Sequence, residues 1–166
     1  MQLEEFFDYK NQLMEDLLTT ESVVRLIDEN ISMENAHTLA YKRVFPCEYV
    51  PETVEHGDTY ICFDVDLQAV LDKTFLIPVM YIWVFTHRSN LRLPNGGGVR
   101  TDKLCSEINK VINGSLKYGL GELNLNGVKR FAPMTDFQGK VMTFTAKDFN
   151  RQFNYKKEVP TNRKSG

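Results

Sequence analysis

The sequence holds only three cysteines and no apolar run long enough to cross a membrane. Cys47, Cys62 and Cys105 are odd in number, lack C-x-x-C spacing and have apolar neighbours. We therefore expect each thiol to behave as a small hydrophobe in a chain made in a reducing cytosol. The longest apolar run, residues 75–85, is shorter than the about 20 residues of a membrane helix, and no charged-then-apolar leader opens the chain. These features predict neither a membrane protein nor a protein exported through such a leader.

Common nucleotide-binding and hydrolase motifs are also missing. The residues Asn95–Gly98 precede a predicted helix, but they complete neither a Walker loop nor a dinucleotide fingerprint, so a flexible connector is favoured. His37, His56 and His87 are far apart, and the chain has no His-Glu-x-x-His pair and no Gly-x-Ser-x-Gly elbow. We expect a protein that is not an enzyme and needs no cofactor or metal.

The composition fits one globular domain. The chain has 166 residues, of which 42% are hydrophobic and 25% charged, and its net charge of −2 gives no general attraction to nucleic acid. We predict a single α+β domain over residues 1–150 and a basic, extended tail over residues 151–166. The tail carries five cations, Arg151, Lys156, Lys157, Arg163 and Lys164, against Glu158 alone, whereas residues 1–35 hold nine acids against two bases. A solvated helix face and a frayed tail are the favoured interpretation; the alternative is that both ends meet complementary patches on neighbouring subunits.

Apolar spacing predicts three helices. From Leu3 onward apolar residues recur at helical intervals, and a second short helix follows Thr19 and Thr20. Residues 30–41 are polar, which predicts irregular structure. A further amphipathic helix is expected over Val99–Ile112, with Val99 on its apolar side and Gly114 as a left-handed cap.

The strands are predicted from alternation and turn residues. A brief strand is expected at Arg43–Pro46, and residues 59–67 alternate clearly between apolar and polar positions, which predicts a second strand. This strand is expected to form an antiparallel hairpin with the long strand at 75–85. Pro78 lacks an amide donor, which argues for an edge position or a bulge. Asn126-Gly127 predicts a two-residue hairpin turn, and the alternation after Gly139 predicts a last strand that closes the sheet. The result is a mostly antiparallel sheet packed by an N-terminal helix and one central helix.

The long strand is the most informative feature. Both of its alternating sets are apolar, so both faces of the strand need a cover. A chain of this size offers few helices for that purpose. We therefore expect one face to be covered by something else, such as another copy of the chain.

Two alternatives of other classes stay open. Asp64 and Asp66 lie on one face of a strand, which is a geometry able to hold Mg²⁺ or Mn²⁺ in a nuclease. Acids that protect a strand edge from aggregation are the commoner case. Tyr81, Trp83 and Phe85, with Arg88 and Arg92 close by, also fit a platform for single-stranded nucleic acid, although a core strand is favoured.

The order of these segments resembles the tail terminator and tail completion proteins of tailed bacteriophages. The resemblance rests on KRVFP followed by TYICFDVDL, the long strand IPVMYIWVFTHRS, the helix GVRTDKLCSEINKVING, and the closing pair GELNLN and GKVMTFTAKDFN. It spans nearly the whole chain and implies a tail-terminator-like α+β subunit without enzymatic activity. The extended loop Cys47–Asp58 and the tail depart from the smaller terminators, which leaves a head-closure or other neck component as an alternative.

What the resemblance implies is a ring, expected to be a homohexamer, that caps the tail tube and joins it to the head connector in the virion neck. Its partners would be other copies, the tail-tube protein and head-connector proteins, with DNA only as cargo passing through the lumen and with no membrane. The strand around Met80–Phe85 would lie near subunit contacts, and the loop Arg88–Gly98 at a ring surface or lumen. The expected contact residues are Met80, Tyr81, Trp83, Phe85, Arg88, Arg92, Arg151, Lys156 and Lys157.

Overall fold

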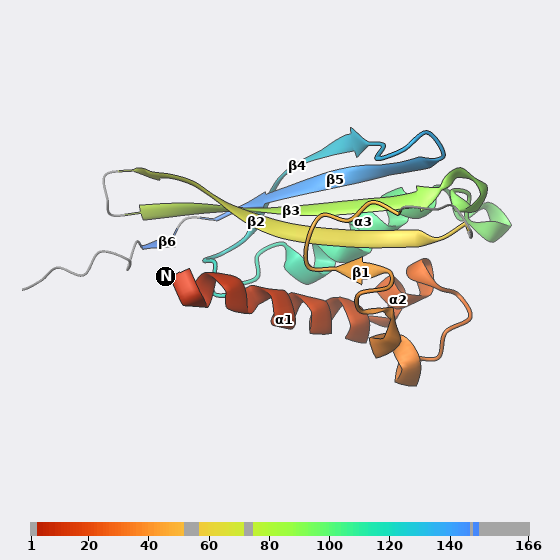
Figure 1. Cartoon of the computed structure of the whole chain (residues 1–166), viewed down its shortest axis with the longest axis horizontal. Helices are drawn as coiled ribbons and strands as arrows, with labels where there is room; N and C mark the ends of the chain where they lie inside the picture. The colour runs from red at the N-terminus through yellow and green to blue at the C-terminus, as the bar shows by residue number, and fades with distance from the viewer. Residues whose placement is uncertain (1–2, 52–56, 72–74, 147, 150–166) are drawn as a thin grey trace, which may run out of the picture.

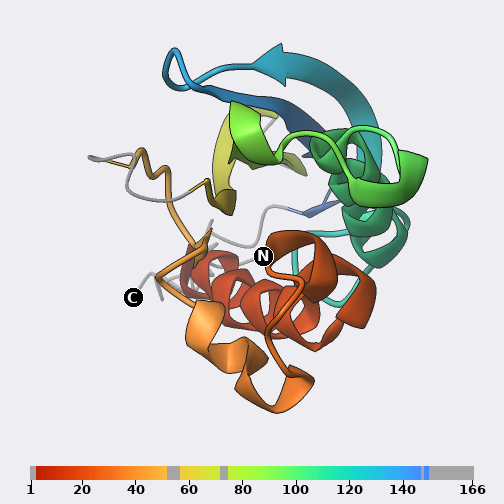
Figure 2. The same ribbon diagram turned by 90° about the vertical axis from the view of Figure 1, so that its right-hand side faces the viewer.

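The protein is a twisted sheet with its helices on one face (Figures 1 and 2). The computed structural model describes residues 3–51, 57–71, 75–146 and 148–149. The predicted basic tail, residues 151–166, lies outside these residues. The predicted turn at residues 72–74 also lies outside them, whereas the strands on either side of it are described.

The sheet has six strands, and all but one of the pairings are antiparallel. The strands are β1 (Val44–Phe45), β2 (Thr59–Leu71), β3 (Phe75–His87), β4 (Asn124–Phe131), β5 (Phe137–Thr145) and β6 (Asp148–Phe149). Their order is β1-β2-β3-β5-β4, with β6 also paired to β3, and only β1 and β2 run parallel. The predicted α+β class, the hairpin of β2 and β3 and the brief strand at β1 are confirmed. The last long strand, β5, lies inside the sheet between β3 and β4 and does not close it.

The helical segments follow the predictions except in one region. The α-helices are α1 (Leu3–Thr19), α2 (Glu21–Ile27) and α3 (Arg100–Ile112), and the short 3₁₀ helices are η1 (Met33–Leu39), η2 (Arg88–Asn90) and η3 (Pro94–Gly96). The expectation of irregular structure at 30–41 is thus wrong for η1. Polar residues there face solvent while Ala36 and Leu39 are buried, so a few apolar positions suffice to hold the segment against its neighbours.

The helices cover the inner face of the sheet. Cross-strand register brings Phe63, Ile82 and Met142 into one row, and the next row holds Val65, Met80 and Phe144. These side chains are buried in one core together with Leu13 and Leu17 of α1 and Leu104 and Ile108 of α3. Burial of each such side chain contributes about 1.5–3 kcal/mol, so this core is the main source of stability.

At one end, the outer face carries a smaller core. Phe45, Tyr60, Phe85 and Phe137 are buried there, and Tyr49 stacks on Phe45 with ring centroids 3.9 Å apart. The chain covers this end with its own loop after β1. The rest of the outer face, toward the middle of β3 and β5, has no comparable cover among the described residues.

Pro78 does not lie on an edge strand, because β3 pairs on both sides. Its carbonyl accepts a hydrogen bond from the amide of Ala146 at 3.2 Å, so the side of Pro78 that lacks a donor faces β5 and β6. The β5 pairing begins at Val79, and the β6 pairing ends at Leu76. The proline therefore stands opposite a break between two partner strands, where no donor is required.

Two further expectations are corrected by the structure. Asn126 and Gly127 lie within β4, at a shift of register between Leu125 and Gly127, and do not form a hairpin turn. Gly127 does not have the positive φ that such a turn requires. Val99 is the N-cap residue of α3 and is 41% exposed, so it does not lie on the apolar side of the helix as expected. Gly114 has the predicted left-handed conformation, with a φ of 77°.

Candidate functional site

The uncovered part of the outer face carries four half-buried side chains, which we call the outer patch: Tyr81, Trp83, Val141 and Thr143. Register places Tyr81 beside Thr143 and Trp83 beside Val141 on neighbouring strands. The two aromatic rings stack with centroids 5.8 Å apart at an interplanar angle of 20°. A rigid pair of aromatic rings that also carries a hydroxyl group and a ring N–H is typical of the centre of protein interfaces.

The sequence-predicted contact residues divide into three groups. Met80 and Phe85 are 0% and 1% exposed and serve the chain's own two cores. Tyr81 and Trp83 lie in the outer patch. Arg88 and Arg92 are exposed beyond the end of β3, and Arg88 pairs with Asp136 at 3.2 Å.

The remaining three predicted contacts, Arg151, Lys156 and Lys157, lie outside the described residues. The structure brings Tyr81 and Trp83 together, and the two arginines of the following loop stay separate from them. Among the predicted contact residues that the structure describes, Tyr81 and Trp83 are thus the pair that lies together on one surface.

The carboxylates proposed for a metal are on one strand, but Asp64 is already engaged. Its Oδ1 accepts from the hydroxyl of Tyr9 at 3.2 Å and lies 3.2 Å from Nζ of Lys10. Burial, followed by the nearby Asp64, raises the pKa of Tyr9 well above its usual value, so this phenol keeps the proton that it donates. The described residues contain no group of three or more His, Cys, Asp and Glu side chains able to hold a metal ion. The cation at Asp64 weakens the nuclease alternative, because its charge offsets the carboxylate that a metal would need.

The cysteines give no support to thiol chemistry at the two buried positions. Burial raises the pKa of Cys62 and of Cys105 to about 12 in each case, so both are thiols at neutral pH. All three cysteines are free, and Cys47 is exposed. The expectation that Cys47 behaves as a small hydrophobe is thus wrong, because it lies two residues after the end of β1, where the chain leaves the sheet.

A second apolar surface lies at the other side of the sheet, between α3 and β4. A hollow of about 350 Å³ is lined by Cys105, Leu125, Val128 and Met142, among others. Leu125 and Val128 are 37% and 46% exposed, so β4 presents two apolar side chains to solvent here. We call this surface the β4 groove.

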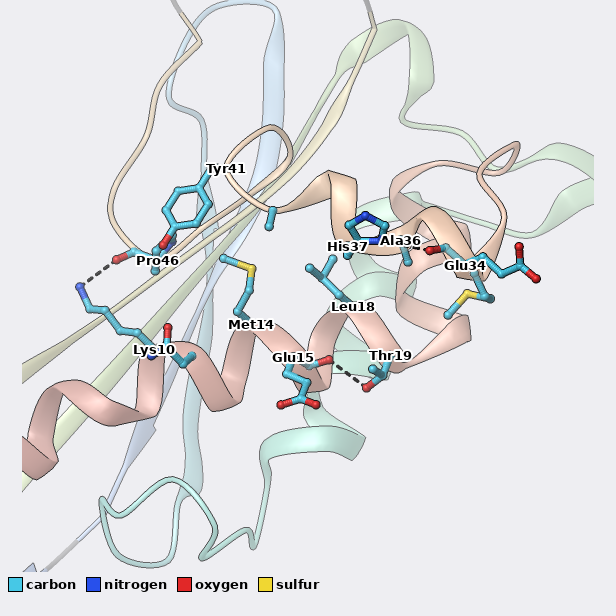
Figure 3. Close-up of a pocket in the computed structure, with 13 residues that line it drawn as sticks. Lys10, Met14, Glu15, Leu18, Thr19, Glu34, Ala36, His37, Tyr41 and Pro46 are labelled. Atoms are coloured by element: carbon cyan, nitrogen blue, oxygen red, sulfur yellow. Dashed lines mark hydrogen bonds between the residues drawn. The ribbon is translucent and has the colours of Figure 1, made fainter.

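A third surface is a groove of about 460 Å³ between α1 and η1, which we call the α1–η1 groove (Figure 3). Met14 and Leu18 of α1 and Met33 of η1 line it, and Tyr41 stands at one end. Glu15 and Glu34 lie on its rim. Methionine adapts to irregular partners, so a groove of this composition suits a peptide-like segment.

Tyr41 adopts a backbone conformation that large residues rarely accept. Its φ is 58°, and it opens the turn in which its amide donates to the carbonyl of Val44 at 2.8 Å. The side chain is nevertheless 67% exposed. Left-handed backbone at a bulky residue costs on the order of 1 kcal/mol, so the exposed ring is held at the groove at some cost to stability.

Sequence reasoning did not find either groove. Met33 and Tyr41 fall within the stretch of residues 30–41 that was expected to be irregular, and Val128 belongs to a strand that was predicted as one arm of a hairpin. A large residue at a left-handed position leaves no signal in composition or periodicity. Only the outer patch could be found from alternation.

Comparison with known proteins identifies a family for this chain. The family model described as YomW matches residues 8–146, from within α1 to just past the end of β5. That name is given to a phage-type gene product of Bacillus, so the match places the chain among phage-associated proteins. No curated protein matches the sequence. Within the described residues, no helix is long and apolar enough to cross a membrane.

Proposed function

The chain belongs to the YomW family, and from that premise we propose that it is a virion structural protein of the neck or tail end, a tail terminator or tail completion protein. In this proposal it forms a ring with other copies, caps the tail tube and joins it to the head connector. It acts by shape and surface contact and performs no chemical reaction. A head-closure or other neck role would use the same kind of contact.

The observation that carries the proposal is the outer patch. The chain covers one end of its outer face with its own aromatic core; Trp83 packs against the border of that core, and the stacked Tyr81 and Trp83 stay half-buried in the middle of the sheet. Stacked aromatic rings that stay half-buried on a sheet face, with no other described element over them, favour a protein contact. The patch is flanked by Asp64 and Lys129, which are of opposite charge, so it lacks the continuous basic groove of a platform for single-stranded nucleic acid.

The β4 groove supplies the second half of such a contact. A ring needs two different patches on each subunit, because head-to-tail contacts join unlike surfaces. The outer patch and the β4 groove lie on opposite faces of the sheet. The outer patch is mainly aromatic, and the groove combines apolar side chains with Asp102 and Lys140. Simple strand addition along β4 is disfavoured by Lys129, Arg130 and the irregularity at Gly127, all of which protect an edge strand.

The experiment is a measurement of mass in solution with a charge placed in the outer patch. Thr143→Arg adds a cation beside Tyr81 without removing any apolar side chain, and Thr135→Arg, in the exposed loop between β4 and β5, is the matched control. We expect the unmodified chain and the control to form a closed ring, by light scattering or particle images, and Thr143→Arg to remain a subunit of about 19 kDa. A chain that stays monomeric alone and with the tail-tube and connector proteins of its phage would contradict the proposal.

A nuclease with Asp64 and Asp66 at its site is the second candidate. The observation that favours it is their position two residues apart on one strand, with Asp66 exposed. Replacing both with asparagine and assaying DNA cleavage in Mg²⁺ separates the two functions. Cleavage by the unmodified chain that the double variant loses would support the nuclease.

A further inference from the structure

We propose that the C-terminal segment of the chain, residues 150–166, docks in the α1–η1 groove of its own subunit. This inference concerns a different surface from the outer patch and does not depend on ring formation. It identifies an intramolecular contact that ties the last residues of the chain to its first helix.

The groove is built to receive apolar side chains. Met14, Leu18 and Met33 are at its lining, and the ring of Tyr41 stands at one end in solvent (Figure 3). An apolar cavity of about 460 Å³ is within the range of sites that bury a ligand. The backbone of Tyr41 has an unfavourable positive φ, and its ring is largely exposed. A partner that covers the ring would remove its apolar surface from water, and this burial would offset the cost of the backbone conformation.

The rim of the groove carries negative charge that is not balanced nearby. Among the residues that the structure describes, neither the carboxylate of Glu15 nor that of Glu34 forms an ion pair. Lys10 is the cation of the lining, but its ammonium already contacts Asp64 at 3.2 Å and the carbonyl of Pro46 at 2.8 Å. An occupant with apolar anchors and adjacent cations therefore fits this groove best.

The C-terminal segment has that composition. Phe153, Tyr155 and Val159 supply apolar groups, and Lys156 and Lys157 lie directly between them. The segment holds five cations and one acid, whereas the first 35 residues hold nine acids and two bases. The opposite charges of the two ends of the chain are already evident in the sequence, and the α1–η1 groove is the surface at which they can meet.

The end of the described chain is in the right place. Strand β6 ends at Phe149, and Figures 1 and 2 both show it near the start of α1. From Leu3 to Met14, α1 rises about 16 Å at about 1.5 Å per residue. Eight extended residues after Phe149 span up to about 26 Å, which is long enough for residues 155–157 to reach the groove of the same subunit.

The test is disulfide trapping in the full chain. With Cys47→Ser as background, Glu34→Cys is combined with Lys157→Cys, and Glu122→Cys with Lys157→Cys is the matched control at an exposed acid of the loop before β4. In dilute protein under mild oxidation we expect an intrachain disulfide to form at least about fivefold faster in the Glu34→Cys protein than in the control. An equal rate in the two proteins, or a product joined only between chains, would overturn the proposal.

Charge exchange within the same background checks the contact chemistry. Glu15→Lys should slow trapping by about threefold, and adding Lys156→Glu should restore the rate. Tyr41→Asn, which keeps a residue that tolerates left-handed backbone, should slow trapping by removing the ring. Unchanged rates in Glu15→Lys and Tyr41→Asn, with unaltered circular dichroism, would contradict docking in this groove.

Discussion

Gly139 occupies a position in β5 where no side chain fits. A Cβ built there would overlap the carbonyl oxygen of Val84 and lie 2.7 Å from Cα of Phe85, both in the backbone of β3. Backbone in the middle of a paired sheet cannot move aside without breaking its ladder. We expect Gly139→Ala to lower the free energy of unfolding by roughly 3 kcal/mol, measured by urea denaturation.

The control for this prediction is Gly127→Ala in the neighbouring strand. No atom lies within 4 Å of a Cβ at Gly127, and its φ is not positive. This substitution should change stability by no more than about 0.5 kcal/mol. Equal losses in the two variants would mean that β5 is not pressed against β3 as the register indicates.

The three cysteines should differ sharply in reactivity. Cys62 and Cys105 are buried, and burial raises the pKa of each thiol to about 12, whereas Cys47 is exposed. At pH 8 we expect a thiol reagent to modify Cys47 alone in the folded protein and all three after unfolding in guanidinium. Rapid modification of a second thiol without denaturant would show that one of the two cores opens easily.

Helices and strands were predictable where a single periodicity dominates. The stripe of α1, the alternation of β2 and the two-sided apolar pattern of β3 each gave the right element, because burial on one or both faces imposes that spacing. Where a local turn signal competed with strand pairing, the pairing determined the secondary structure. Asn126-Gly127 is a strong turn dipeptide, yet the chain continues through it as β4 because β5 offers partners on both sides of the shift.

Arg100 joins three elements that the sequence alone did not connect. It is 3% exposed, and its guanidinium donates to the carbonyl of Leu26 at 2.9 Å, to that of Asn90 at 2.9 Å and to Glu29 Oε1 at 2.6 Å. Removing the guanidinium group leaves the carbonyls of Leu26 and Asn90 without their hydrogen-bond donor, at the junction of α2, α3 and the loop after β3. We expect Arg100→Met to cost about 3 kcal/mol of unfolding free energy.

Two substitutions calibrate the role of Arg100. Arg100→Lys keeps the charge but cannot reach three acceptors at once, so its loss should be intermediate. Arg92→Met, at an exposed arginine of the same loop, should remain within about 0.5 kcal/mol of the parent. If Arg100→Met were as stable as Arg92→Met in chemical denaturation, the junction would be held by packing alone.

Glu107 of α3 should contribute to stability above acidic pH. Hydrogen bonds from Lys110, at 2.8 Å, and from Ser22 hold the pKa of this carboxyl below its usual value. A group whose pKa is lower in the folded state stabilises the fold above its unfolded pKa of about 4.3, and this contribution is lost as pH falls through the folded pKa. The stability of Glu107→Gln should therefore fall less steeply between about pH 5 and pH 3 than that of the parent.

The comparison for that pH profile is Glu122→Gln, at an exposed carboxylate. Its curve of unfolding free energy against pH should follow the parent curve. The parent and Glu107→Gln should differ most near neutral pH and converge at low pH. A constant difference across the whole range would assign the effect of Glu107 to packing and not to its charge.

The arrangement of the whole chain explains which surfaces could be foreseen. Alternation along β3 predicts two apolar faces, and that is confirmed, but which end of the outer face stays open depends on where the loop after β1 crosses β2. Phe45 and Tyr49 cover Tyr60 there and leave Tyr81 and Trp83 half-exposed. The order of strands and the meeting of α1 with η1 arise from contacts between distant residues, so neither groove had a local signature.

Trp83 is the only tryptophan of the chain, which makes its fluorescence a direct report on the outer patch. In the isolated subunit the indole is half-buried and borders solvent. If copies associate through this face, the indole loses water, and its emission should move to shorter wavelengths as the protein concentration rises through the range in which light scattering detects assembly. Thr143→Arg should keep the emission of the dilute protein at every concentration, whereas Thr135→Arg should follow the parent. Assembly with constant emission would mean that subunits join through another surface, and the outer patch would then face solvent, the tail tube or the connector instead of a neighbouring copy.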